Sequence, residues 1–394
     1  NISLTNVLVC ANLCFAFETF GRYTQKGIHK MRKTVPFKIV LLFTIFIMLL
    51  TGCKARDQKS ADQNVESADK QQEETSLDTA SQKKVQKNIF AMDTYMTVTA
   101  YGENAGEAVD AAIDEINRLD ALLSTGKDTS QVALINKNKS AVLTEDTQAL
   151  LKKSLELYES TGHRFDITIY PVMCLWGFPT EEYRVPQDDE IMQTLNLVGS
   201  DKLMYEEETN TLTLRDGMAI DFGGIAKGYT SSKLMDIFRK YGVSSAMVSL
   251  GGNVQVLGAK TDGSDWRVAV QNPDGTDDYL GILAIKDKAV ITSGGYERYF
   301  EEDGKIYHHI MDNETGKPAD SDLISVTIIS KDGMLADGLS TALFVMGKED
   351  ALNYWREHSE EFDAILVTKD GEITVTKGIA DSFSSERNYD IAER

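Results

Sequence analysis

Residues 88–380 contain separate blocks of sequence, some with the apolar period of a helix and others with that of a strand. The order of these blocks is the feature that excludes the most fold classes. A fold of parallel strands with intervening helices would instead repeat both periods in strict alternation. The blocks therefore predict an α+β fold with antiparallel sheets, formed by one domain of roughly 290 residues. The expected helices are 105–123, 147–158, 229–241, 335–345 and 348–357, and the expected strands or hairpins lie at 89–101, 203–214, 246–329 and 364–376.

The chain on either side of this domain is polar. Residues 54–87 contain almost no aromatic residues and show no apolar period, which is typical of a disordered linker. With Cys53 they form the expected tether, 53–87. Residues 381–394 are expected to be a polar tail.

A short apolar run at residues 39–50 follows a basic segment that begins at Met31. The run is too short to cross a bilayer as a stable helix, and the pattern is typical of a secretory signal, here 31–52. Residues 1–30 do not fit a signal, and Met31 is the better start. We therefore expect residues 1–30 to be translated upstream sequence, outside the fold.

The tetrapeptide Leu-Thr-Gly-Cys that ends at Cys53 resembles a bacterial lipobox. The resemblance implies cleavage before Cys53 and a diacylglycerol on its sulfur, which would anchor the protein to the outer face of a bacterial membrane. A plain signal peptide or an uncleaved anchor is the alternative.

Charge and cysteine content exclude several classes of protein. The net charge is −20, and removing the +5 of residues 1–52 leaves −25. Such an acidic body disfavours nucleic acid and anionic lipid headgroups as partners, so the lipid rather than charge would hold it at a membrane.

Within the domain only Cys174 remains, so no disulfide framework is possible. Its apolar neighbours predict that Cys174 is a small buried residue rather than a nucleophile.

Three glycine-containing segments also carry side chains that handle charge: 221–228, 308–318 and 336–342. The first reads as the turn from a buried strand into a helix. Its backbone N–H groups could face a phosphate, with Lys227 adding a point charge. A glycine turn that serves only tight packing is the alternative, and the pattern is not a P-loop.

The other two segments offer candidate metal and base residues. Asp337, Ser340 and Thr341 fall at i, i+3 and i+4 of a predicted helix, so their oxygens share one face, as would suit Mg²⁺. The alternative is an ordinary helix N-terminus, where the helix dipole favours Asp337 and where Ser340 and Thr341 are merely exposed. His308 and His309 follow each other in a predicted strand, so only one of them can point into a site. That histidine could be a base, and a purely structural histidine is also open.

Together these motifs resemble those of the ApbE-type flavin transferases, the FAD:protein FMN transferases, over residues 88–347. The sequence departs from the family pattern at Ile167, Met311 and Asn313, where other residues are usual, and these departures touch no charged group. The matching segments are 91–94, 165–168, 175–178, 220–229, 249–253, 292–296, 308–318 and 336–347.

The resemblance implies a set of functional residues. His309 would be the base. The FAD pocket would be lined by Met92, Asp166, Asp221, Lys227 and Ile310, and Mg²⁺ would be bound by the Gly224 carbonyl, Asp337 and Thr341, with Ser340 beside them.

The implied activity is Mg²⁺-dependent transfer of FMN from FAD to a Thr or Ser hydroxyl of an exported or membrane flavoprotein, with release of AMP. An FAD pyrophosphatase that gives FMN and AMP is an alternative, since water could replace the hydroxyl. A lipid-anchored flavin- or solute-binding protein without chemistry is an alternative of another class.

Overall fold

The computed structural model describes residues 83–275 and 278–394. The predicted signal, Cys53 with its predicted lipid and most of the predicted tether lie outside these residues. Within the described part of the chain, no helix combines the length and the apolarity needed to cross a bilayer.

The described part consists of helices and mainly antiparallel strands, which confirms the predicted α+β class. The helices are α3 (Ala105–Leu123), α4 (Gln131–Asn138), α5 (Glu145–Ser160), α6 (Tyr170–Trp176), α7 (Asp188–Leu195), α8 (Ala226–Lys240), α9 (Gly333–Met346) and α10 (Lys348–Glu357). The strands are β1 (Lys84–Ala91), β2 (Thr94–Tyr101), β3 (Ser140–Val142), β4 (Met204–Glu206), β5 (Thr211–Thr213), β6 (Ser245–Leu250), β7 (Asn253–Leu257), β8 (Trp266–Gln271), β9 (Tyr279–Ile285), β10 (Ala289–Gly294), β11 (Tyr299–Glu302), β12 (Lys305–His308), β13 (Met311–Asp312), β14 (Lys317–Pro318), β15 (Leu323–Ser330), β16 (Phe362–Thr368), β17 (Ile373–Thr376), β18 (Phe383–Ser384) and β19 (Asp390–Ala392).

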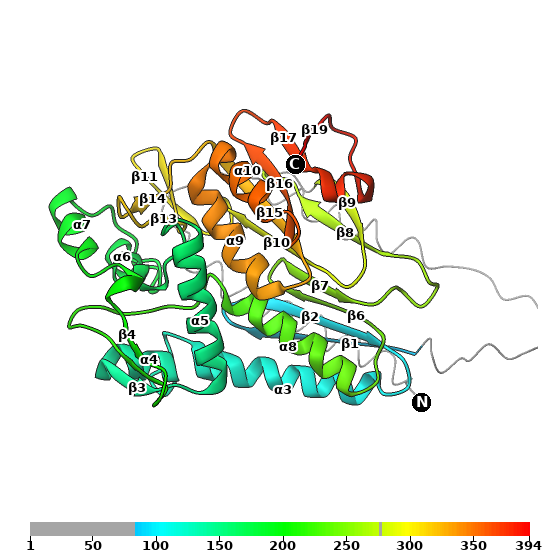
Figure 1. Ribbon diagram of the computed structural model, residues 1–394, viewed down its shortest axis with the longest axis horizontal. Coiled ribbons are helices and arrows are strands. Elements are labelled where there is room, and N and C mark those ends of the chain that lie inside the picture. Colours follow the sequence, from blue (N-terminus) through cyan, green and yellow to red (C-terminus); the bar gives the residue numbers. More distant parts are fainter. Residues whose placement is uncertain (1–82, 276–277) are drawn as a thin grey trace, which may run out of the picture. The chain divides into compact units, whose positions relative to one another are not determined.

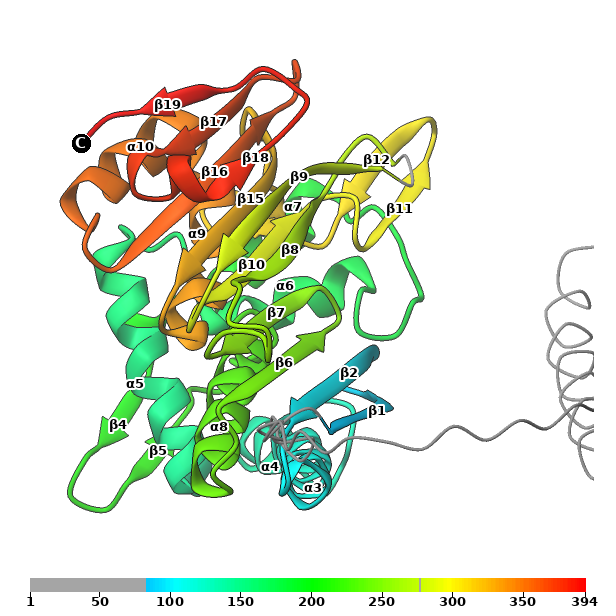
Figure 2. The ribbon, with the colours of Figure 1, turned by 90° about the vertical axis from the view of Figure 1, so that its right-hand side faces the viewer.

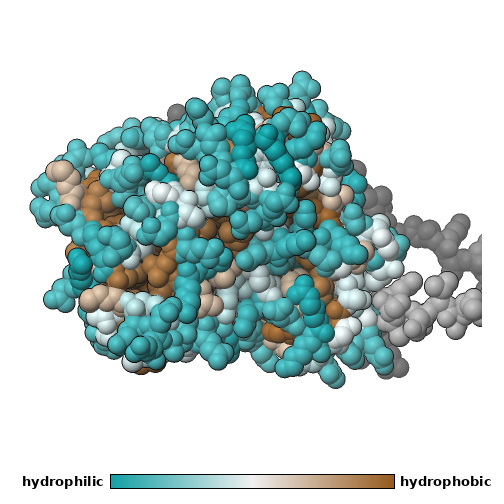
Figure 3. All heavy atoms as spheres, viewed as in Figure 1, coloured by the Kyte–Doolittle hydropathy of each residue, from teal (hydrophilic) through white to brown (hydrophobic). Residues whose placement is uncertain are grey.

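A nine-stranded sheet in the order β1-β2-β6-β7-β10-β15-β16-β17-β19 organises the fold (Figures 1 and 2). Helices α3, α8 and α9 cover one face of this sheet, where their apolar residues form two core clusters with the strands. On the other face the smaller sheet β18-β9-β8 packs against β7, β15 and β16 in a third cluster. On the side of the molecule shown in Figure 3, hydrophilic residues predominate, and apolar residues lie mostly in recesses between them. The helical layer and the sheet together position the candidate site.

The predicted helices agree closely with the observed ones. Helices α3 and α10 have the predicted bounds, α5 and α9 enclose theirs, and α8 begins three residues earlier than expected. The predicted hairpins at 203–214 and 364–376 are the pairs β4–β5 and β16–β17. Helices α4, α6 and α7 were not predicted.

Three predictions about strands and boundaries were wrong. Residues 89–101 form part of a hairpin rather than one strand, because Met92 and Asp93 both adopt a left-handed conformation (φ 49° and 58°) and reverse the chain between β1 and β2. The tail 381–394 belongs to the fold, since β19 pairs in parallel with β17 and the Phe383 side chain is buried in the core. The first strand begins at Lys84, four residues before the expected start of the domain.

Candidate functional site

The centre of the candidate site is the crossing of α8 and α9. The backbone N–H of Gly228 in α8 donates to Oδ2 of Asp337 in α9, at 2.8 Å. A Cβ atom at Gly228 would lie 2.1 Å from the carbonyl oxygen of Gly333, so only glycine permits this approach. The glycine that the sequence placed in a phosphate-binding turn therefore brings two helices together.

Asp337 is a buried carboxylate that is held from two sides. Its side chain accepts from Gly228 at Oδ2 and from Asn253 Nδ2 at Oδ1 (2.9 Å), and 4% of its surface is exposed. Burial raises the pKa of this carboxyl, while the nearby Lys227 ammonium and these hydrogen bonds oppose the rise. The N–H of Gly228 expected to face a phosphate is thus already used by Asp337.

The remaining candidate metal ligands lie beside Asp337. The hydroxyl of Ser340 donates to the Asp337 carbonyl (2.8 Å) and lies 2.8 Å from the hydroxyl of Ser293. Ser293 also approaches Thr341 Oγ1 at 3.4 Å, and Thr341 Oγ1 lies 3.8 Å from a Cβ built on Gly224. The structure therefore brings Gly224, Asp337, Ser340 and Thr341 together, as the sequence predicted. Asp337 and Ser340 are buried and Thr341 is half-buried, so they are not the exposed polar residues of an ordinary helix start.

These groups fit a hard divalent cation. Carbonyl, hydroxyl and carboxylate oxygens are the ligands that Mg²⁺ prefers, together with water and phosphate oxygens. Across residues 83–275 and 278–394, no group of three or more His, Cys, Asp or Glu could hold a metal. An ion bound here would therefore take part of its shell from a substrate phosphate or from water.

His308, the last residue of β12, and His309, which follows it, have different surroundings. His308 Nε2 lies 3.1 Å from the Ala319 carbonyl, and its ring packs edge-on against Phe344 in the core. His309 instead contacts the segment after β10, where its backbone N–H donates to the Arg298 carbonyl at 3.0 Å. Its Nδ1 lies 3.1 Å from the same carbonyl. Because a carbonyl only accepts, Nδ1 carries the proton and Nε2 remains free to accept one.

The imidazole of His309 is held neutral. Burial lowers its pKa to about 3, with the positive charge of Arg298 as the next cause and His308 and Lys227 adding to it. A neutral imidazole with a free Nε2 is the form that can accept a proton at neutral pH.

The ammonium group of Lys227 influences several of the candidate site residues. Its charge acts on Asp337, on His309 and on Asp221, which lies at the turn before α8. Burial raises the pKa of Asp221, whose Oδ1 accepts from the Gly223 N–H at 3.0 Å. The carboxylate of the proposed metal site, Asp337, and the proposed base, His309, are therefore both influenced by one ammonium group.

Of the other residues expected in the flavin pocket, Asp166 has a mainly structural environment. Its carboxylate accepts from the hydroxyl and backbone N–H of Thr168 (2.7 and 2.8 Å) and of Ser200 (2.7 and 3.2 Å). These bonds hold the turn between α5 and α6. Met92 contacts α8 through the Thr230 hydroxyl (3.8 Å from its sulfur), and Ile310 is buried in the main core.

Three residues near the site were missed or misjudged from the sequence. Cys174 is exposed rather than buried, because it lies on the outer side of the short helix α6, near Tyr170 and Asp221. Protein atoms around the thiol nevertheless raise its pKa. Glu297 and Arg298 follow the matched segment 292–296, and no spacing signal singled them out. Burial raises the pKa of Glu297 to about 7, with Lys227 opposing and Asp337 adding to the shift.

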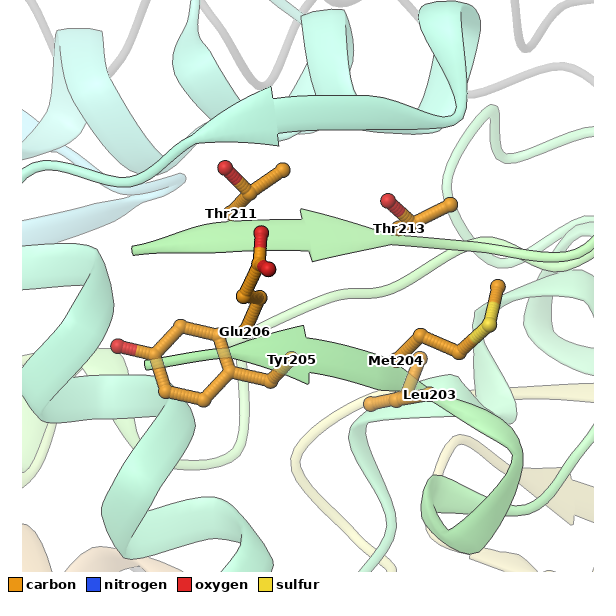
Figure 4. Close-up of a pocket in the computed structure, with 6 residues that line it drawn as sticks. All are labelled: Leu203, Met204, Tyr205, Glu206, Thr211 and Thr213. Carbon is orange, nitrogen blue, oxygen red and sulfur yellow. The ribbon is translucent and has the colours of Figure 1, made fainter. Parts of the chain in front are cut away.

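A hollow elsewhere on the described surface lacks this chemistry. It lies over the β4–β5 hairpin and offers one carboxylate, two hydroxyls and a tyrosine, but no cation (Figure 4). Its lining residues are Leu203, Met204, Tyr205, Glu206, Thr211 and Thr213.

Comparisons with known proteins agree on one family. The model of the ApbE family matches residues 92–366. The FAD:protein FMN transferase of Treponema pallidum is 31% identical over 314 residues, which cover 74% of this chain and 86% of that protein. The FAD:protein FMN transferase of Klebsiella pneumoniae is 34% identical over 266 residues, or 66% of this chain and 82% of that protein.

Solved structures agree with this. The crystal structure of the ApbE protein from Thermotoga maritima has a TM-score of 0.73 and 31% sequence identity, over 78% of this chain and 100% of that chain. The flavin transferase ApbE from Vibrio cholerae has a TM-score of 0.69 and 26% identity, over 76% and 99% of the two chains.

Proposed function

The chain belongs to the ApbE family, and from this premise we propose that it is an FAD:protein FMN transferase. The proposed reaction moves FMN from FAD to a Thr or Ser hydroxyl of an acceptor flavoprotein and releases AMP. One observation carries the proposal. The candidate metal ligand Asp337, the candidate base His309 and Asp221 all lie within the field of a single cation, Lys227.

The proposed reaction forms one bond and breaks another at the FMN phosphorus. The acceptor oxygen forms a bond to the FMN phosphorus, and the bond from that phosphorus to the bridging oxygen breaks. AMP leaves with the electron pair. The proton of the acceptor hydroxyl passes to Nε2 of His309, which is the free nitrogen of a neutral ring.

The charge balance supports a divalent cation. Three carboxylates, Asp221, Glu297 and Asp337, interact with Lys227, and Arg298 is a second cation beside Asp221. The pyrophosphate of FAD would add further negative charge. Mg²⁺ held by the Gly224 carbonyl, Asp337 and Thr341, with Ser340 beside them, would neutralise charge that develops on the phosphates.

Around this centre we place the flavin nucleotide near Met92, Asp221 and Lys227. Ile310 is the residue after the base. Asp166 holds the turn whose Ile167 carbonyl accepts from the Asp221 N–H at 2.9 Å. Asp166 therefore supports the pocket through its backbone neighbours.

Two other activities compete with this proposal. If water reached the phosphorus in place of the acceptor hydroxyl, the same groups would hydrolyse FAD to FMN and AMP. A non-catalytic flavin-binding protein would need neither a free Nε2 nor the oxygen ligands around Asp337.

We further propose that the protein acts outside the cytoplasmic membrane. The lipobox-like sequence at Cys53 supports a lipid anchor on the outer face of a bacterial membrane. The acceptor would then be an exported or membrane flavoprotein that faces the same side.

The test is to incubate the purified protein with FAD, Mg²⁺ and a threonine-bearing acceptor domain, and to measure the intact mass of the acceptor. We expect an adduct of one FMN, and none on an acceptor with alanine in place of the threonine. Free FMN and AMP without an adduct would identify a hydrolase. Unchanged FAD would identify a binding protein.

A further inference from the structure

Arg298 connects three segments around the proposed base. Its Nη2 donates to the Phe178 carbonyl at 2.8 Å. Its own carbonyl faces both the backbone N–H and Nδ1 of His309, at 3.0 and 3.1 Å. The ring of Phe178 in turn meets the imidazole edge-on, with the centroids 6.5 Å apart. The guanidinium is thus anchored at a fixed place beside the ring.

Apart from balancing the charge of Asp221, the guanidinium of Arg298 has no role in the proposed reaction. It acts on His309 and on the carboxylate of Asp221. The other groups that face the imidazole are Lys227 from α8 and His308 from β12, both of which also disfavour a positive ring. Among these three residues, Arg298 is the one whose carbonyl accepts hydrogen bonds from His309.

We propose that Arg298 is a positioning residue for His309: its carbonyl fixes the ring with Nε2 free, and its guanidinium keeps the imidazole unprotonated in acidic solution. This inference rests on the proposed function, since it assigns a task to a residue beside the proposed base. It predicts that the transferase keeps its base active at a pH where an ordinary histidine is already protonated.

The sign of the effect is determined by the lowered pKa. A histidine can accept a proton only when the pH of the solution lies above the pKa of its ring. A lower pKa therefore extends the active pH range of the base toward acid. A like charge nearby disfavours the charged form of the ring. Removing the charge of Arg298 should therefore raise the pKa of His309 and move the acid limit of the reaction upward.

Two substitutions separate charge from structure. Arg298→Gln removes the charge but keeps an amide N–H that can donate to the Phe178 carbonyl. Arg298→Lys keeps the charge. Arg239→Gln is a matched control for a lost arginine, because Arg239 is an exposed residue of α8 that pairs with Asp236.

The experiment measures single-turnover FMN transfer from about pH 3 to about pH 8 for each variant at saturating FAD. We expect the acid limb of Arg298→Gln to lie about one pH unit or more above that of the wild type, with similar rates near pH 8. Arg298→Lys and Arg239→Gln should follow the wild type, and FAD affinity should change little. An Arg298→Gln profile that coincides with the wild type, or that falls by one factor at every pH, overturns the proposal.

A second readout does not depend on FMN transfer. Ring ¹⁵N spectra of the wild-type protein report the protonated nitrogen and the pKa of each histidine, with the His309 signal assigned from its absence in His309→Gln. We expect the Nδ1–H tautomer and a pKa well below the ordinary value of about 6.5. An ordinary pKa or the other tautomer would overturn the inference. If the wild type shows this ring but transfers no FMN, the proposed function fails instead.

Discussion

At the scale of single residues, Asp337 combines a structural and a chemical task. Its carboxylate accepts the N–H of Gly228 near the start of α8 and the side chain of Asn253, and it is also the one carboxylate of the proposed metal site. Loss of the side chain therefore affects both stability and chemistry. The sequence pointed to the second task, because i, i+3, i+4 spacing was visible. It could not show the first, which depends on two segments far away in the chain.

We predict that Asp337→Ala lowers Mg²⁺-dependent FAD turnover by several orders of magnitude, because the proposed site loses its only ionised ligand. It should also destabilise the protein by about 1–3 kcal/mol for each donor left without an acceptor. Asp337→Asn keeps an acceptor and should lose the same activity with less destabilisation. Turnover and urea unfolding of both variants decide the point. Near-normal transfer by either one would contradict the metal assignment.

The two histidines allow a second prediction at this scale. His309→Ala should lower FMN transfer roughly 10²- to 10⁴-fold and leave FAD binding nearly unchanged, because a general base acts in the transition state. His308→Ala should mainly lower stability, since that ring packs against Phe344. FAD affinity and single-turnover transfer of both variants are the measurements. A rate loss confined to His308→Ala would exchange the two roles.

The sequence could not predict Arg298 and Glu297, for a physical reason. Both follow the strand β10 and Gly295, where a Cβ atom would lie 2.8 Å from the His308 ring. The guanidinium of Arg298 finds its partner in the Phe178 carbonyl, 120 residues earlier in the chain. Cys174 was misjudged in a similar way. Its apolar neighbours lie on the buried side of α6, while the thiol itself is on the outer side.

At the scale of elements, the sequence was most informative where a period was long. Helix α3 keeps one apolar face over its whole length and was predicted at its exact bounds. The β1–β2 hairpin was missed because strand alternation continues on both sides of a turn without glycine. The C-terminal strands β18 and β19 were missed because they are only two and three residues long and are defined by pairing with distant strands.

The crossing of α8 and α9 gives a prediction for two elements. Gly228→Ala would place a Cβ 2.1 Å from a carbonyl oxygen of the backbone, which cannot rotate away as a side chain could. We expect a loss of roughly 2 kcal/mol or more in the free energy of unfolding, and a loss of activity, because the helix starts must separate. Gly106→Ala in α3 is the control. Nothing lies within 4 Å of its Cβ, so it should stabilise the protein by about 0.5–1 kcal/mol. Equal effects of both substitutions in urea unfolding would contradict the close packing.

At the scale of the whole molecule, the block order of the sequence predicted the fold class but not the strand order. Strands β8 and β9 lie between β7 and β10 in the chain, yet they leave the large sheet and pack across its other face. These four strands are all short and apolar, so the apolar period of the sequence does not show which strand belongs to which sheet. Assignment to one sheet or the other depends on long-range pairing, which only the folded chain reveals.

The proposed lipid anchor belongs to the same scale, because it decides where the whole domain acts. The domain carries a strong negative charge, so it gains nothing from an anionic membrane surface, and a diacylglyceryl group on Cys53 would have to hold it there. We predict that Cys53→Ala releases the protein from membranes or blocks its processing, since two acyl chains anchor a protein far more firmly than one. Cys174→Ala should remain with the membranes, because that thiol lies in the folded domain. Fractionation of cells that express each variant, with labelled palmitate as a probe, measures both. A Cys53→Ala protein that is cleaved after its signal and still fractionates with membranes would show that something other than this lipid holds the transferase in place.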